Sequence, residues 1–62
     1  MIANVKTEDV LLASVWCISH MGKRGVKWEY LGAGDFLIRD EQIAVLFVLR
    51  WGGTIVNHHD KN

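Results

Sequence analysis

The chain has 62 residues and a mass of 7.1 kDa, 50% of its residues are hydrophobic, and seven basic residues balance seven acidic ones. This length bounds it to one small domain, and the apolar content, with three tryptophans, excludes intrinsic disorder and a coiled coil as descriptions of the whole chain. The lack of a basic excess disfavours a general nucleic-acid binder.

The first predicted element is a helix from Glu8 to Met21. Thr7 precedes it as a cap for the free amide groups, and Gly22 is a favourable residue just after its end. Apolar side chains occupy almost every side of this helix, so it must be covered on more than one side. We therefore expect a contact with a second chain, through Leu11, Val15, Trp16 and Ile18.

A β-hairpin is predicted after a turn at residues 22–25. Apolar and polar residues alternate from Val26 to Leu31, which is typical of a half-buried strand. Residues 32–35 form a second turn, and the apolar run 36–38 pairs back on the first strand.

The segment from Asp40 to Trp51 fits two interpretations. Its length, the acidic residues at its start and Arg50 near its end favour a helix that ends at Gly52. Its β-branched and aromatic residues fit a buried strand instead, with Gly52 and Gly53 as a hairpin turn into residues 54–56. We favour the helix and keep the strand as the alternative.

These elements predict a small α+β domain over residues 1–62, with an N-terminal helix, a central hairpin, a second apolar segment and a polar tail at 57–62 that frays. The longest apolar run, Ile43–Leu49, is too short to cross a membrane, and the acidic residues near the N-terminus are unlike a signal peptide. The single cysteine excludes an internal disulfide. We expect a soluble, cytoplasmic protein without a membrane partner.

Four side chains are weak candidates for a metal site: Cys17, His20, His58 and His59. Cysteine and histidine are ligands that zinc prefers, but their spacing matches no standard finger. The competing interpretation is a buried thiol, a histidine at a helix end and a solvated tail. We favour this interpretation and expect neither a metal nor a cofactor.

The sequence offers little for catalysis. Cys17 lies within an apolar helix, where burial should raise its thiol pKa, and no serine stands in a glycine-flanked elbow. Residues 32–34 resemble the start of a dinucleotide loop, but the third glycine is missing and Asp35 would repel phosphate. We therefore expect a protein that is not an enzyme.

A binding role is favoured by aromatic and basic residues that lie close together, which are the usual anchors of an interface. The candidate partner-binding residues are Lys23, Arg24, Lys27, Trp28 and Tyr30, and the alternative is that the two aromatic side chains face the core.

We expect a small protein-interaction module, a homodimer that regulates or inhibits a protein partner. The alternative is a small DNA-binding regulator of helix–turn–helix or winged type, built on helix 40–51 and the hairpin around 32–34. The only basic residue in that helix is Arg50.

Overall fold

The computed structural model describes residues 1–56 and contains two helices and four strands. A short 3-10 helix, Thr7–Asp9, leads directly into the first α-helix. In chain order the elements are β1 (Ile2–Asn4), α1 (Val10–Met21), β2 (Trp28–Gly32), β3 (Asp35–Ile38), α2 (Glu41–Trp51) and β4 (Thr54–Val56). The α+β class predicted from the sequence is confirmed.

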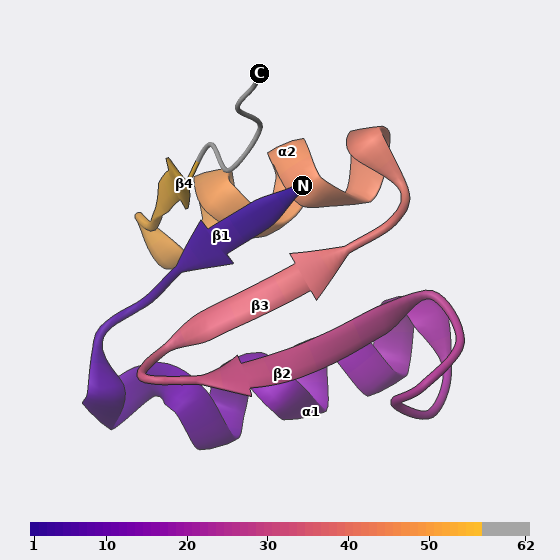
Figure 1. The fold of residues 1–62 in the computed structure, drawn as a ribbon, viewed down its shortest axis with the longest axis horizontal. Coiled ribbons are helices and arrows are strands. Elements are labelled where there is room, and N and C mark those ends of the chain that lie inside the picture. Colours follow the sequence, from indigo (N-terminus) through magenta and orange to yellow (C-terminus); the bar gives the residue numbers. More distant parts are fainter. Residues whose placement is uncertain (57–62) are drawn as a thin grey trace.

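The four strands form one antiparallel sheet in the order β2-β3-β1-β4, and both helices cover the same face of it (Figure 1). This βαββαβ connectivity is that of a ferredoxin-like arrangement. The N-terminal strand β1 lies in the interior of the sheet, where Ala3 is opposite Phe36 on one side and Ile55 on the other. The first and last segments of the domain are therefore joined in one sheet.

The core lies between the sheet and the two helices. Its fully buried side chains include Phe36 from β3 and Phe47 from α2, whose ring centroids are 5.2 Å apart. Alternate strand residues face this layer, so Ala3 and Ile38 are buried while their neighbours Ile2 and Leu37 remain partly exposed. The α1 side chains that complete the core are small or flexible, namely Ala13, Cys17 and Met21.

The predicted first helix is confirmed, but its start and its cap are wrong. The α-helix begins at Val10, and Thr7 lies in the preceding 3-10 helix, so its hydroxyl does not cap α1. The residue at the cap position is Asp9, whose side chain makes no capping hydrogen bond. The end agrees with the prediction, because Gly22 adopts a positive φ and its amide donates to the Ile18 carbonyl at 2.9 Å.

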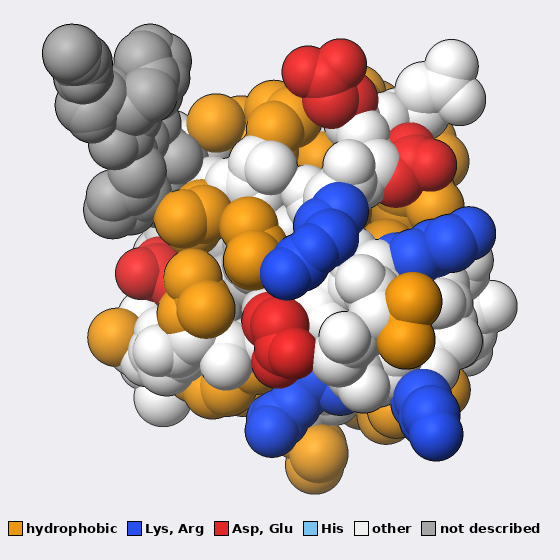
Figure 2. All heavy atoms as spheres, turned by 45° about the vertical axis from the view of Figure 1, so that its right-hand side comes forward, with side chains coloured by type: hydrophobic (Ala, Val, Ile, Leu, Met, Phe, Trp, Pro, Cys, Tyr) orange, Lys and Arg blue, Asp and Glu red, His pale blue; other side chains and the backbone are white. Residues whose placement is uncertain are grey.

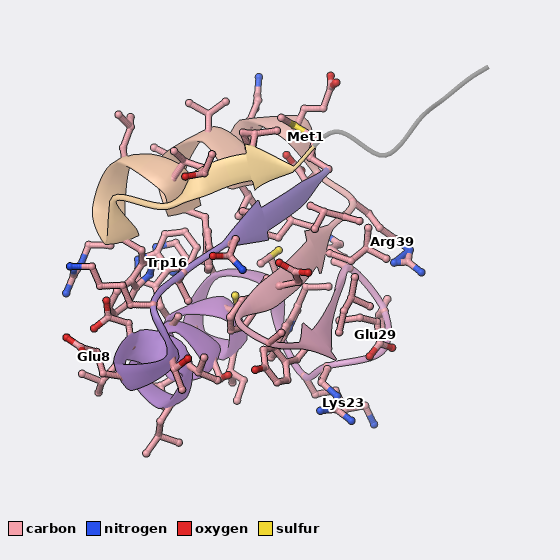
Figure 3. All side chains as sticks on the ribbon, turned by 60° about the vertical axis from the view of Figure 1, so that its left-hand side comes forward. Met1, Glu8, Trp16, Lys23, Glu29 and Arg39 are labelled. Carbon is pink, nitrogen blue, oxygen red and sulfur yellow. The ribbon has the colours of Figure 1, made fainter. Side chains whose placement is uncertain are left out.

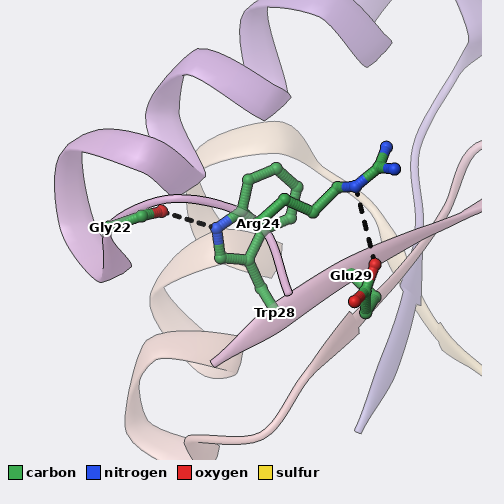
Figure 4. Close-up of polar contacts among 4 residues, drawn as sticks. All are labelled: Gly22, Arg24, Trp28 and Glu29. Carbon is green, nitrogen blue, oxygen red and sulfur yellow. Dashed lines mark hydrogen bonds and ion pairs between the residues drawn. The ribbon is translucent and has the colours of Figure 1, made fainter. Parts of the chain in front are cut away.

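The predicted hairpin is present, with its first strand shifted along the chain. Strand β2 begins at Trp28, and Val26 lies before it with an exposed side chain. The Trp28 side chain is 2% exposed, and its indole Nε1 donates to the Gly22 carbonyl oxygen at 2.8 Å (Figure 4). Trp28 therefore connects β2 to the end of α1.

The segment 41–51 is helical, so the favoured interpretation is confirmed and the strand alternative is wrong. The Asp40 carboxylate accepts a hydrogen bond from the Ile43 amide at 3.1 Å and caps α2. Gly52 ends the helix in the left-handed conformation and donates to the Val48 carbonyl. The apolar residues that suit a strand are arranged instead around a helix whose Ala44 and Phe47 face the core.

Two short strands complete the sheet. β1 precedes the predicted N-terminal helix and was not predicted. Residues 54–56 were expected to form a strand only in the alternative that made 40–51 a strand. They form β4, which pairs with β1 and not with the segment before it. The predicted fraying tail, residues 57–62, lies outside the described residues.

Candidate interaction surfaces

The outer face of α1, which points away from the sheet, is mostly aliphatic, and the exposed Ser19 and His20 are the polar residues near its end. Leu11 is 75% exposed and Val15 is 52% exposed, and Leu12 and Ile18 are exposed to a similar degree. Between Val10 and Met21 the chain contains no Lys, Arg, Asp or Glu. Three of the four residues expected to contact a second chain, Leu11, Val15 and Ile18, are thus accessible on this face.

The fourth expected contact residue, Trp16, lies between the two helices (Figure 3). Its indole contacts the Phe47 ring of α2 edge-on, with ring centroids 5.6 Å apart, and it stacks on His20 at 3.8 Å. Trp16 therefore packs between the two helices. Because it is only half-buried, part of its side chain also belongs to their outer surface.

Helix α2 carries a second group of exposed aliphatic side chains, which sequence reasoning did not select: Val45, Leu46 and Leu49. Because α1 and α2 cover the same face of the sheet and touch through Trp16 and Phe47, we treat their outward side chains as one surface. We call it the helix layer, and it comprises Leu11, Leu12, Val15, Ile18, Val45, Leu46 and Leu49. The signal for its α2 part was present in the sequence as apolar residues on every side of the second helix.

A basic end lies at the edge of the molecule where β2 begins and β3 ends. It comprises Lys23, Arg24, Lys27 and Arg39, four of the seven basic residues, and all four are exposed. Figure 3 shows Lys23 and Arg39 at the same end of the molecule with Glu29, away from Trp16. Figure 2, turned to bring this side forward, shows Lys and Arg side chains grouped there with acidic ones among them.

Backbone pairing brings the fourth basic residue to this end. The Arg39 amide donates to the Lys27 carbonyl oxygen at 2.9 Å, which extends the β2–β3 ladder by one pair. Sequence reasoning missed Arg39 because its proximity to Lys27 depends on the register of the hairpin. The Arg24 side chain is partly neutralised by Glu29, with Nε and Oε1 3.5 Å apart (Figure 4).

The two aromatic candidates for partner binding belong to the fold. Trp28 is buried in the core, so its inclusion among the partner-contact residues is corrected. Tyr30 is half-buried against Phe36, and its hydroxyl oxygen accepts a hydrogen bond from the Gly34 amide at 3.0 Å. The alternative, in which these rings face the core, is therefore correct for Trp28 and partly correct for Tyr30.

The candidate metal ligands are not brought together. Cys17 is fully buried, whereas His20 is exposed, with Nδ1 2.9 Å from the Trp16 carbonyl oxygen. His58 and His59 lie outside the described residues, and residues 1–56 contain no group of three ligands that could hold a metal ion. Burial raises the pKa of the Cys17 thiol to about 12, as expected, so it is protonated near neutral pH.

Within residues 1–56 there is no pocket. Neither α1 nor α2, at 12 and 11 residues, is long and apolar enough to cross a membrane. The chain matches no protein-family model, no curated protein and no solved structure.

Proposed function

We propose that this chain is a small, non-enzymatic protein-interaction module that regulates or inhibits a protein partner by covering part of the partner's surface. The observation that carries the proposal is the basic end, where four exposed basic residues lie together, and the helix layer supports an interaction role in general. A domain with a small core leaves seven large aliphatic side chains exposed on one side, and such patches on soluble proteins mark contact sites. The protonated Cys17 thiol and the lack of a pocket in the described residues give no support to catalysis.

The basic end is the proposed contact with the regulated partner. Glu29 offsets part of its charge, and the remaining cations suit an acidic protein surface. Lys23 and Arg24 lie on the loop that follows α1, while Lys27 and Arg39 are held opposite each other by the sheet. The proposed compartment is the cytosol, where a single buried thiol stays reduced.

The test is affinity capture of the tagged chain from cells of its source, with the recovered partner then purified and titrated. The variant Lys27→Glu reverses one charge at the basic end. Its matched control is Lys6→Glu, an exposed lysine two residues before Glu8, which Figure 3 shows at the opposite end of the molecule from Lys23 and Arg39. We expect Lys27→Glu to weaken binding at least tenfold and Lys6→Glu to leave it unchanged. Equal effects of both variants, or no effect of either, would contradict the proposal.

The second candidate function is DNA binding, and the observation that favours it is again the basic end. The helix–turn–helix form of this candidate does not fit, because the β2–β3 hairpin separates α1 from α2. Phosphate contacts through the basic end would give an affinity that falls steeply with salt. A gel shift with mixed duplex DNA at low salt tests the candidate, and the absence of a shift would exclude it.

A further inference from the structure

The helix layer exposes a large amount of apolar surface for a domain of this size. The exposed fractions of its seven residues, backbone included, sum to roughly 700 Å², which is on the scale of the largest patch of a typical monomer, about 300–600 Å². An interface of standard size takes about 800 Å² from each partner. The layer, with the half-buried Trp16 between its two helices, is therefore close in area to one side of a standard interface.

The charge of the layer restricts what can cover it. Between Val10 and Met21, α1 contributes no Lys, Arg, Asp or Glu, and its one basic residue is His20 in the last turn, which stacks on Trp16. This face therefore offers little to steer an acidic or basic partner. Glu41 and Arg50 lie at opposite ends of α2 and leave the middle of that helix uncharged. A complementary surface is thus apolar, uncharged and similar in area, and a second helix layer has all three properties.

From these observations we infer that the helix layer is the interface of a homodimer. Two copies related by a two-fold axis pack their helix layers together, with a sheet on the outside of each copy. The inference rests on the proposed interaction function and names a second copy of the chain as the occupant of this surface. It leaves the basic end of each copy exposed, so a dimer presents two such ends.

Burial on dimerisation would also add to the stability of a small domain. Within residues 1–56 the core contains ten buried hydrophobic side chains, two of which are alanines on the helices. Domains of this size are marginally stable, and extra apolar burial contributes about 25 cal/mol per Å² before the cost of association. We therefore expect folding and association to be coupled.

The experiment is sedimentation equilibrium of the full chain at roughly 100 µM, a concentration at which a dimer with a Kd of about 1 µM is mostly formed. Val15→Glu places a charge in the middle of the layer, and Val26→Glu is its matched control, because Val26 is also an exposed valine but lies in the loop before β2. Leu49→Glu, on α2, is a second interface variant that covers the case of a misfolded Val15→Glu. Circular dichroism reports whether each variant is folded.

We expect the mass of two chains for the wild type and for Val26→Glu, and the mass of one chain, or an unfolded chain, for both layer variants. A wild type that sediments as a folded single chain would overturn the homodimer. So would dimers that persist with both Val15→Glu and Leu49→Glu. Either result leaves the proposed function standing if the captured partner still distinguishes Lys27→Glu from Lys6→Glu, so the two failures can be told apart.

Discussion

The Trp28 indole donates a hydrogen bond of 2.8 Å to the carbonyl oxygen of Gly22, and this bond joins the edge strand β2 to the residue that follows α1. This bond gives a polar partner to an indole that is otherwise buried. Trp51 provides the contrast, because within the described residues its Nε1 is buried without a partner, while the Arg50 guanidinium lies 4.1 Å from its ring centroid. A Trp→Phe substitution therefore removes a hydrogen bond at position 28 but not at position 51.

Replacing Trp28 by Phe should lower the free energy of unfolding by about 1–2 kcal/mol, since it removes the hydrogen bond and part of the packed ring. Trp51→Phe is the matched control, and it should cost less because no hydrogen bond is lost. Urea unfolding followed by circular dichroism measures both. Equal losses in the two variants would mean that the bond to Gly22 does not stabilise the fold.

The cap of α2 gives a second comparison. Asp40→Ala removes the acceptor of the Ile43 amide and should destabilise the domain by about 1 kcal/mol. Asp9→Ala removes an aspartate at the same position of α1, but this side chain makes no capping hydrogen bond and should matter less. Thermal unfolding of the two variants checks the difference. A larger loss for Asp9→Ala would contradict the assignment of the caps.

At three glycines a side chain would be costly for different reasons, namely the backbone conformation, a close contact, or both. Gly52 has a positive φ with open space around it, whereas a side chain on Gly53 would meet the Asn4 carbonyl oxygen. Gly34 combines both constraints, with φ at +85° and the Val5 carbonyl oxygen in the way. We expect Gly52→Ala to cost about 1–2 kcal/mol and Gly34→Ala to cost most. If Gly34→Ala were as stable as Gly52→Ala, the close approach of the β2–β3 turn to β1 would be incorrect.

Cys17 should make stability depend on alkaline pH. Its thiol pKa is about 12 in the folded chain and 9.0 without burial, so between these values the unfolded chain loses the proton first. The contribution of the thiol is therefore fully present below pH 9 and is lost as the pH rises towards 12. The difference in unfolding free energy between the wild type and Cys17→Ala should shrink over this range. A constant difference would show that the thiol is not desolvated by folding.

The elements with strong local signals were predictable from the sequence. The alternation around Trp28 and the acidic residue before a long apolar run at Asp40 both reflect interactions within a few residues. β1 and β4 are three residues each, too short for a periodic pattern, and they form only because the domain brings residues distant in the chain together. Thr7 was misassigned as a cap because a 3-10 turn before α1 leaves the same sequence signature.

The candidate surfaces were predictable to the extent that they lie on one element. Leu11, Val15 and Ile18 share one face of a single helix, so periodicity identifies them. Arg39 joins the basic end through strand pairing with Lys27, which requires the register of the hairpin. Whether an aromatic residue such as Trp28 faces the core or the solvent depends on which face of the sheet the helices cover, and that is a property of the whole fold.

The central claim is that the helix layers of two copies meet, and isotope-filtered NMR on a mixture of labelled and unlabelled chains tests it most directly. We expect nuclear Overhauser effects between copies at the methyl groups of Leu11, Val15, Ile18 and Leu49, which lie on the outer faces of α1 and α2. Methyl groups of Val26 and Leu31, which are exposed elsewhere, should show none. Effects confined to Val26 and Leu31, or no effects between copies at high concentration, would contradict the account.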